Sequence, residues 1–199
     1  MKDKLCSTLE QRIGLLTRIK HKVNSEKIEL IADAIFTSKL RYAIAVYSTP
    51  KFEFNNMEQA MDPNISKLQV LQNDLLRMQA GHSRKDHTNM KTLRESKKLM
   101  SVNQISCYHV GIEMFNLIYN SSSQSLQENM KIQERGYSLR NLKDGQVKVP
   151  NKGKKSCTGF SYTGPKFWNN LPSDIRTTEK RETFKLKLKN WIWSNIPSI

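Results

Sequence analysis

A basic loop followed by aromatic residues is the stretch of this 199-residue sequence whose residue types could do chemistry. No acidic residue occurs between Gly145 and Ser173. The cations of the stretch are Lys148, Lys152, Lys154, Lys155 and Lys166, and its aromatic residues include Phe160, Tyr162 and Trp168. Lysines can neutralise phosphates and exposed rings can stack on unpaired bases, so the pattern favours nucleic-acid contact.

The same residues allow a second interpretation, in which the aromatic rings are core and the lysines are merely solvated. Phe167, Trp168 and Trp191 occur at helical spacing beside Leu171 and Leu188. A stripe of this kind is more often buried than exposed, so we expect these three rings in a core. We expect the lysine loop, in contrast, to contact nucleic acid.

Two predicted helices carry further basic candidates. The last helix, expected to begin after Thr177 or Thr178 and to run to about Trp193, has basic residues at four-residue steps, which share one face. These are Arg181, Lys185 and Lys189. The first helix, predicted over residues 5–22, has basic residues away from its apolar stripe, and these are Arg12, Arg18, Lys20 and Lys22.

Neither metal binding nor nucleophilic catalysis is indicated by the sequence. The histidines His21, His82, His87 and His109 are scattered, and no cysteine lies within two to four residues of another. We expect His82 and His87 to be surface residues and Cys6 and Cys107 to be core thiols, because His109 would lie on another helix face than Cys107. The three cysteines are far apart, which favours reduced thiols. Neither a phosphate-binding nor a dinucleotide-binding glycine pattern occurs, so we expect no cofactor and no small-molecule substrate.

The charge of the chain points to a polyanionic partner. The net charge is +15 and the pI is about 9.8. There are 18 basic and 13 acidic residues up to position 130, against 15 and 5 after it, so the C-terminal third is the more basic part. Inside a cell such a partner is usually nucleic acid, although a solvated lysine-rich surface would explain charge alone equally well. The sequence shows neither a membrane span nor a signal peptide, so we expect an intracellular protein, nuclear or cytoplasmic.

Apolar periodicity predicts a mainly α-helical fold. Residues 5–22 and a second helix ending near Ser48 would form a helical hairpin, the second capped by Asn24 or Ser25. Pro63 and Gly81 bracket another helix, with Asp62 as its N-cap. Further helices are predicted over residues 90–98, from a Ser101–Gln104 capping box to about Tyr119, over residues 126–135, and from Pro165 to Pro172.

One β element is expected. Asp144-Gly145 is a hairpin turn signal, which predicts a small β hairpin near residues 137–149. The resulting organisation is a helical hairpin over 1–50, a helical region over 51–135, and a basic C-terminal region over 136–199 that ends in a basic helix.

Residues 160–193, FSYTGPKFWNNLPSDIRTTEKRETFKLKLKNWIW, resemble a block that closes the reverse transcriptase polyprotein of many jockey-like non-LTR retrotransposons. The matching residues are Phe160, Ser161, Tyr162, Gly164, Pro165, Lys166, Trp168, Asn169, Leu171, Pro172, Ile175, Arg176, Phe184, Lys185, Lys187, Leu188 and Lys189. Two other segments resemble the same family. Arg12-Ile-Gly-Leu-Leu, with Arg18, Ile19 and His21, looks like the start of its thumb, and KLQVLQNDLLRMQAG at 67–81 resembles a string that follows the thumb.

The resemblance implies the thumb and post-thumb part of an RNA-directed DNA polymerase. Such a polymerase needs adjacent palm aspartates to hold Mg²⁺, and this sequence has no Asp-Asp pair, so we expect no catalysis by this chain alone. Implied partners are RNA template, RNA–DNA hybrid and a separate palm or another protein. A stand-alone helical protein-interaction module and a non-functional transposon relic are the alternatives.

Overall fold

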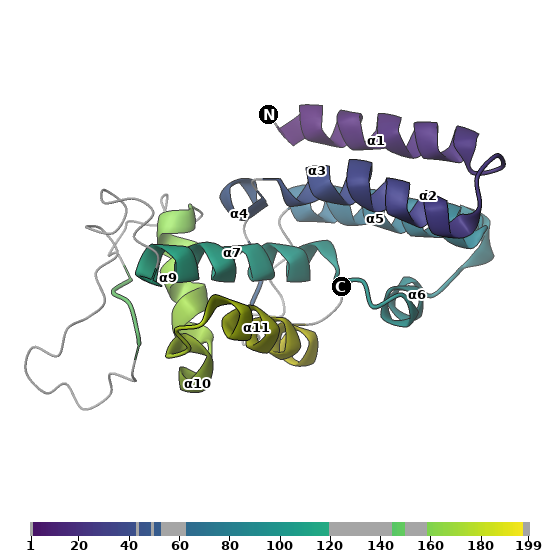
Figure 1. Cartoon of the computed structure of the whole chain (residues 1–199). Coiled ribbons are helices and arrows are strands. Elements are labelled where there is room, and N and C mark those ends of the chain that lie inside the picture. The colour runs from purple at the N-terminus through teal and green to yellow at the C-terminus, as the bar shows by residue number, and fades with distance from the viewer. Residues whose placement is uncertain are drawn as a thin grey trace, which may run out of the picture. The chain divides into compact units, whose positions relative to one another are not determined.

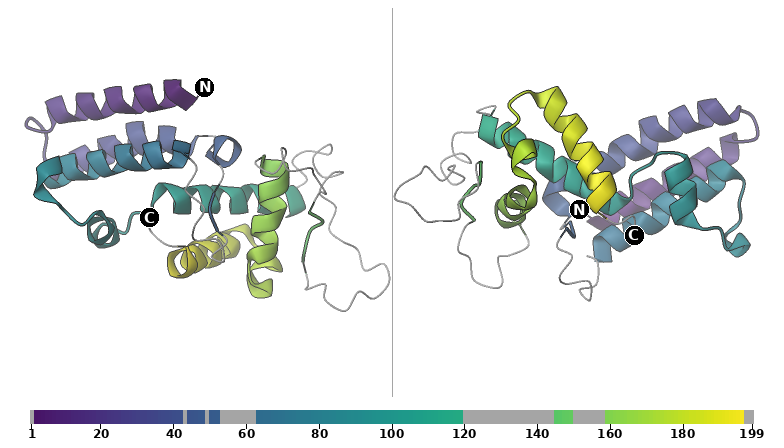
Figure 2. Two further views of the ribbon diagram at one scale, coloured as in Figure 1. Left: turned by 180° about the vertical axis from the view of Figure 1, so that it is seen from behind. Right: turned by 90° about the horizontal axis from the view of Figure 1, so that it is seen from below.

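The computed structural model describes residues 2–42, 44–48, 50–52, 63–119, 145–149 and 159–196. These residues form two compact units, the first drawn from 1–48 and 53–105 and the second from 49–52 and 106–197. Helices account for most of the described chain (Figures 1 and 2), so the predicted mainly α-helical fold is confirmed.

The first unit begins with a helical hairpin. Its elements are α1 (Lys2–Ile19), α2 (Ser25–Ala32), the π-helical turn η1 (Asp33–Thr37), α3 (Ser38–Arg41) and α4 (Ile44–Tyr47). α1 and α2 run in opposite directions in both side views (Figures 1 and 2). Asn24 caps α2, since its Oδ1 accepts the Lys27 backbone N–H at 3.0 Å. The second predicted helix therefore starts where expected but is interrupted by η1 and again after Arg41.

The remaining helical elements of the first unit are α5 (Pro63–Ala80), a short 3₁₀ turn η3 (Arg84–Asp86) and α6 (Met90–Ser96). α5 keeps both predicted ends, whereas α6 begins where predicted but ends at Ser96 rather than at residue 98. Gly81 follows α5 with a φ of +74°, which favours glycine, and the His82 N–H reaches back to the Arg77 carbonyl at 2.9 Å. Asp62, the predicted N-cap, lies outside the described residues.

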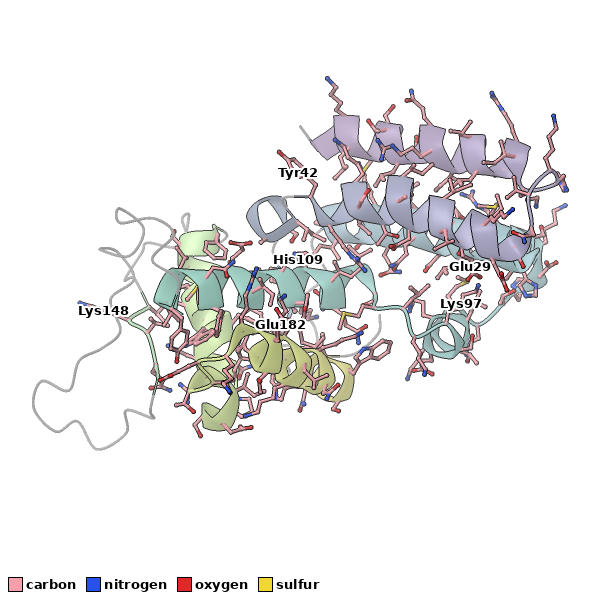
Figure 3. The ribbon with its side chains drawn as sticks, in the orientation of Figure 1. Glu29, Tyr42, Lys97, His109, Lys148 and Glu182 are labelled. Carbon is pink, nitrogen blue, oxygen red and sulfur yellow. The ribbon has the colours of Figure 1, made fainter. Side chains whose placement is uncertain are left out.

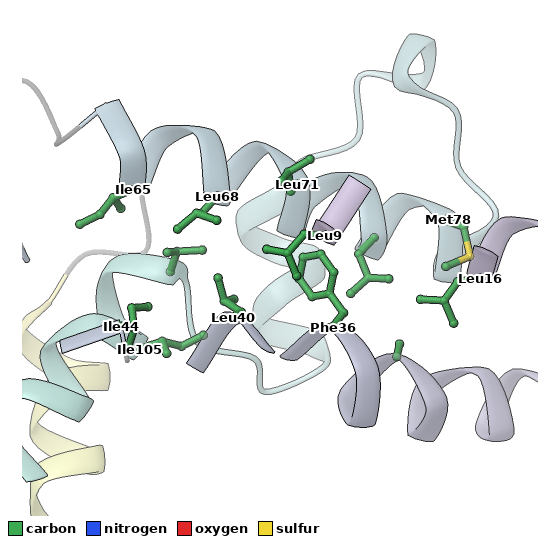
Figure 4. Packing of buried hydrophobic residues seen from close by; sticks show 13 residues of the cluster. Leu9, Leu16, Phe36, Leu40, Ile44, Ile65, Leu68, Leu71, Met78 and Ile105 are labelled. Atoms are coloured by element: carbon green, nitrogen blue, oxygen red, sulfur yellow. The ribbon is translucent and has the colours of Figure 1, made fainter. Parts of the chain in front are cut away.

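The core of the first unit lies between α5 and the two arms of the hairpin. Leu9 and Leu16 of α1, together with Phe36 and Leu40, are completely buried against the apolar face of α5 (Figure 4). The apolar residues that α5 contributes are Ile65, Leu68, Leu71, Leu75 and Met78. The predicted apolar faces of these helices are thus the ones that pack together.

The second unit is built on α7 (Val102–Tyr119), whose first turn belongs to the first unit. The helices that pack with it are α9 (Phe160–Asn170), α10 (Ser173–Arg176) and α11 (Arg181–Asn195). The predicted capping box opens α7, because Ser101 N–H donates to Gln104 Oε1 at 2.9 Å and Gln104 N–H donates to Ser101 Oγ at 3.3 Å.

Two predicted helix boundaries in the second unit are wrong. α9 begins at Phe160, so Pro165 lies inside the helix rather than at its start. Gly164 reduces the usual conflict, because it has no Cβ to clash with the proline ring. Thr177 and Thr178 do not cap α11; their hydroxyls donate back to the carbonyls of Ser173 and Asp174 at 2.9 and 2.8 Å.

The predicted β hairpin is not supported. Residues 137–144 lie outside the described residues, as does the helix expected over 126–135, and residues 145–149 form no strand. The backbone of Val147 pairs with one side chain: its N–H donates to Asn169 Oδ1 at 2.9 Å and its carbonyl accepts from Asn169 Nδ2 at 2.8 Å. The amide of Asn169 therefore fixes Val147 beside α9.

Candidate nucleic-acid interface

The basic helix α11 is fixed in the second unit by an apolar stripe. Phe184, Leu188 and Ile192 are completely buried. The ring of Phe184 stacks on Phe115 of α7, with centroids 4.5 Å apart. Gly111 admits α11 closely, because a Cβ at this position would meet Leu188 Cδ2 at 2.6 Å. One face of α11 is therefore committed to the core, and the remaining face is presented to solvent.

That outer face carries the predicted cations. Arg181 and Lys189 are exposed, whereas Lys185 is half-buried and its Nζ lies 2.8 Å from Glu182 Oε1. The hydrogen bond and positive charge of Lys185 lower the pKa of Glu182. Leu186, between the lysines, is 62% exposed. Successive cations on this face are about 6 Å apart along the helix axis, because each residue rises 1.5 Å.

Two further lysines flank this face, and sequence reasoning gave neither a role. Lys180 is exposed directly before α11. Lys187 is held by the turn between α10 and α11 instead, since its Nζ donates to the Asp174 carbonyl at 3.0 Å and to Thr178 Oγ1 at 3.2 Å. Lys180 could have been found from its position beside Arg181; the role of Lys187 depends on the turn between α10 and α11.

The aromatic residues of the motif serve the core, as expected for Phe167, Trp168 and Trp191. Phe167 and Trp168 are completely buried and Trp191 is half-buried. Trp168 Nε1–H donates to the Gly145 carbonyl at 2.8 Å, and Gly145 has a φ of +75°. Trp168 and its neighbour Asn169 thereby hold residues 145–149 against α9.

Lys148 is the member of the predicted lysine loop whose position is described. Its side chain is exposed on the segment held by Asn169 (Figure 3). Lys152, Lys154 and Lys155 lie outside the described residues. Lys166 is half-buried on α9, with its Nζ 5.6 Å from the ring centroid of Tyr162, at cation–π distance.

The basic residues predicted for the first helix belong to the first unit and do not share one environment. α1 ends at Ile19, so Lys20 and Lys22 follow it. Arg12 is half-buried and donates to the Ile35 carbonyl in η1. Arg18 and Lys22 are exposed, and Lys20 is half-buried. Arg18 and Lys22 are therefore the accessible candidates of this group, and the guanidinium of Arg12 supports the irregular turn η1.

A network of buried polar side chains was missed by sequence reasoning. Gln69 lies at its centre: its Nε2 donates to Gln72 Oε1 at 2.8 Å and to Asn73 Oδ1 at 3.0 Å. Its Oε1 accepts the Val102 N–H at 2.8 Å, at the start of α7. The buried Arg94 also donates to Asn73, at 2.8 Å. The sequence carried a signal for this network, because Gln69 and Gln72 in LQVLQN are three residues apart, the same helical spacing as Leu68 and Leu71.

Nothing in the described part of the chain suggests a metal or thiol site. Within it, no group of three or more His, Cys, Asp or Glu side chains is placed to hold a metal ion. Burial raises the pKa of the Cys107 thiol, as expected for a core cysteine. His82 and His87 are exposed.

No helix of the described residues has the length and apolar character required to cross a membrane. Comparison of the chain with known protein families, with curated proteins and with solved structures gives no match.

Proposed function

We propose that this chain is a non-catalytic nucleic-acid-binding protein related to the thumb and post-thumb region of a jockey-like non-LTR reverse transcriptase. Its ligand would be RNA or an RNA–DNA hybrid. The observation that supports the proposal best is α11, whose outer face presents Arg181 and Lys189 to solvent while its inner face is fully buried. A rigid helix with regularly spaced cations is suited to neutralising phosphates.

The remaining cations support the proposal in two separate places. Lys148 is exposed in the second unit and precedes the other lysines of the same loop in the sequence. Arg18 and Lys22 are exposed in the first unit, at the end of the helix that resembles the thumb. Since Trp168 is buried, the proposed contact relies on charge more than on stacking by that ring.

Binding to an RNA hairpin and to an RNA–DNA hybrid, measured over a salt series from ~50 to ~200 mM, tests the proposal. We expect the affinity to fall steeply with salt. The variant R181A/K185A/K189A should bind more weakly, and its salt slope should be smaller by about 2 to 3, because each lost phosphate contact removes roughly 0.7–0.9 from the slope.

The matched control is K27A/K67A/K91A, which removes the same charge from exposed positions in the first unit. Equal losses of affinity in both triple variants would show that binding depends only on the net charge of the chain. Binding that is absent, or that does not respond to salt, would contradict the proposal and favour a protein-interaction module or a relic.

A further inference from the structure

The first unit contains a groove that the nucleic-acid proposal does not use. The groove has a volume of about 530 Å³ and is lined by α2, η1, Arg41 at the end of α3, α5, Ile105 and the segment that leads from α6 to α7. Its floor includes Leu75, Leu76 and Phe36, which are buried. An apolar floor within a concave surface is the usual basis for recognition of a partner helix.

The edge of this groove is also apolar at one point. Leu30 of α2 lines the groove and is 71% exposed. The neighbouring Ile28 is buried, so α2 already contributes to the core and Leu30 is not needed there. Exposed Leu30 therefore extends the apolar floor outward to the point where an incoming side chain would make first contact.

The wall between floor and edge is shaped by the π-helical turn. In η1 the Ser38 N–H bonds to the carbonyl of Asp33, five residues earlier, and the turn is correspondingly wider than an α-helical one. Asp33, Phe36 and Thr37 of this turn line the groove. Arg12 donates to Ile35 in the same turn. The irregular wall is thus held by a specific contact.

The charge on the wall formed by α2 and η1 is opposite to that of the chain, whereas the groove's cations, Arg41 at the end of α3 and Lys97, lie on other elements. Glu26, Glu29 and Asp33 line the groove along successive turns of α2 and η1, in a chain of net charge +15. Glu29 pairs with Lys97 across the groove (Figure 3). Among the described residues neither Glu26 nor Asp33 forms an ion pair. These two carboxylates, about two helical turns apart, are left to attract cations.

We infer that this groove binds a basic amphipathic helix of a partner protein. The apolar face of that helix would cover Leu30 and the floor, and its lysines or arginines would face Glu26 and Asp33. This inference is independent of the proposed nucleic-acid site, which uses other residues and the opposite charge. RNA itself is disfavoured here, because its phosphates would meet the acidic wall.

A synthetic peptide of about 16 residues tests the inference, long enough to form a helix in the groove. It carries leucines at i, i+3, i+4 and i+7 and lysines elsewhere, and a second peptide has glutamate in place of every lysine. Fluorescence anisotropy with the full chain should show binding of the lysine peptide and none of the glutamate peptide. Attraction by net charge cannot explain a preference for the lysine peptide, because the chain as a whole is positively charged and repels cations.

The variant E26K/D33K should weaken peptide binding at least tenfold, and so should Leu30→Gln, which removes apolar surface without adding charge. The matched control E10K/E113K makes the same charge change at exposed glutamates outside the groove and should change affinity by less than about twofold. Circular dichroism confirms that each variant is folded. Hydrogen exchange on the unmodified chain should show protection by the peptide in residues 25–41, 72–79 and 97–105, the segments that line the groove.

Three results would overturn the inference: equal affinity for the two peptides, equal losses in E26K/D33K and its control, or protection outside those residues. Failure of the unmodified chain to bind the lysine peptide would do the same. Protection of the same residues by a short single-stranded RNA would identify nucleic acid as the occupant and equally reject a helix.

Discussion

The two units of this protein are stabilised in different ways. In the first, buried amides of Gln69 and Gln72 hold separate segments together through hydrogen bonds, including one from Gln72 Nε2 to the Met100 carbonyl at 2.9 Å. In the second, rings of Phe115, Trp168 and Phe184 pack closely, with Trp168 and Phe184 centroids 5.6 Å apart. A polar network depends on complete pairing, whereas an aromatic core depends on shape and volume.

The largest effect should come from removing the central ring of the aromatic core. Trp168→Ala leaves a cavity and unpairs the Gly145 carbonyl, so we expect the free energy of unfolding to fall by about 3–5 kcal/mol. Denaturant unfolding measures the loss. Hydrogen exchange should rise first in residues 160–196, and an unchanged midpoint would show that this core is not what stabilises the second unit.

The polar network should be the next most sensitive. Gln69→Leu keeps a similar volume but removes the acceptor for the Val102 N–H and the donor to Asn73, which should cost about 1–3 kcal/mol. Val70→Ala, at a 53% exposed position on the same helix, is the control and should have little effect. Equal unfolding midpoints for the two variants would mean that water replaces the amide without loss.

Two helical glycines test the comparison, because replacing each with alanine should change the stability of the protein in opposite directions. Gly111→Ala places a Cβ 2.6 Å from Leu188 Cδ2; overpacking of about 1–3 kcal/mol then exceeds the roughly 1 kcal/mol gained in helix propensity. A Cβ added at Gly14 of α1 would meet no neighbouring element within 4 Å, so Gly14→Ala should stabilise by up to about 1 kcal/mol. Thermal unfolding of both variants measures the two effects. Midpoint temperatures that shift in the same direction would refute the packing argument.

The smallest effect concerns the surface of α11. Lys185 lowers the pKa of Glu182 by hydrogen bond and charge, so Lys185→Ala should raise that pKa toward its ordinary value. A lowered folded-state pKa stabilises the protein above the unfolded-state pKa, and this contribution is lost as pH falls through the folded-state pKa. NMR titration of the Glu182 carboxyl carbon measures the shift. Arg181→Ala, the control, should move it less, because Arg181 is the weakest of the causes.

Local signals in the sequence determined most of the helices. Asn24, Gly81 and the Ser101–Gln104 pair act at helix ends through bonds to nearby backbone, so adjacent residue types were sufficient to locate them. Apolar periodicity likewise identified the buried faces of α1, α5 and α11, because burial follows the helical repeat. The sequence also supplied the cations of the candidate interface, although their ligand stays a prediction.

Long-range contacts decided the rest. Asn169 pairs with the backbone of Val147, 22 residues earlier, and Gln69 caps a helix 33 residues later, which spacing alone cannot reveal. The π-helical turn η1 forms part of a groove that includes residues of α5 and Ile105, far away in the chain. Sequence patterns report which face of a helix is apolar, but the partner of that face depends on how distant segments meet. Only the tertiary structure could therefore separate the cations bonded within the protein, such as Lys187, from those left for a ligand.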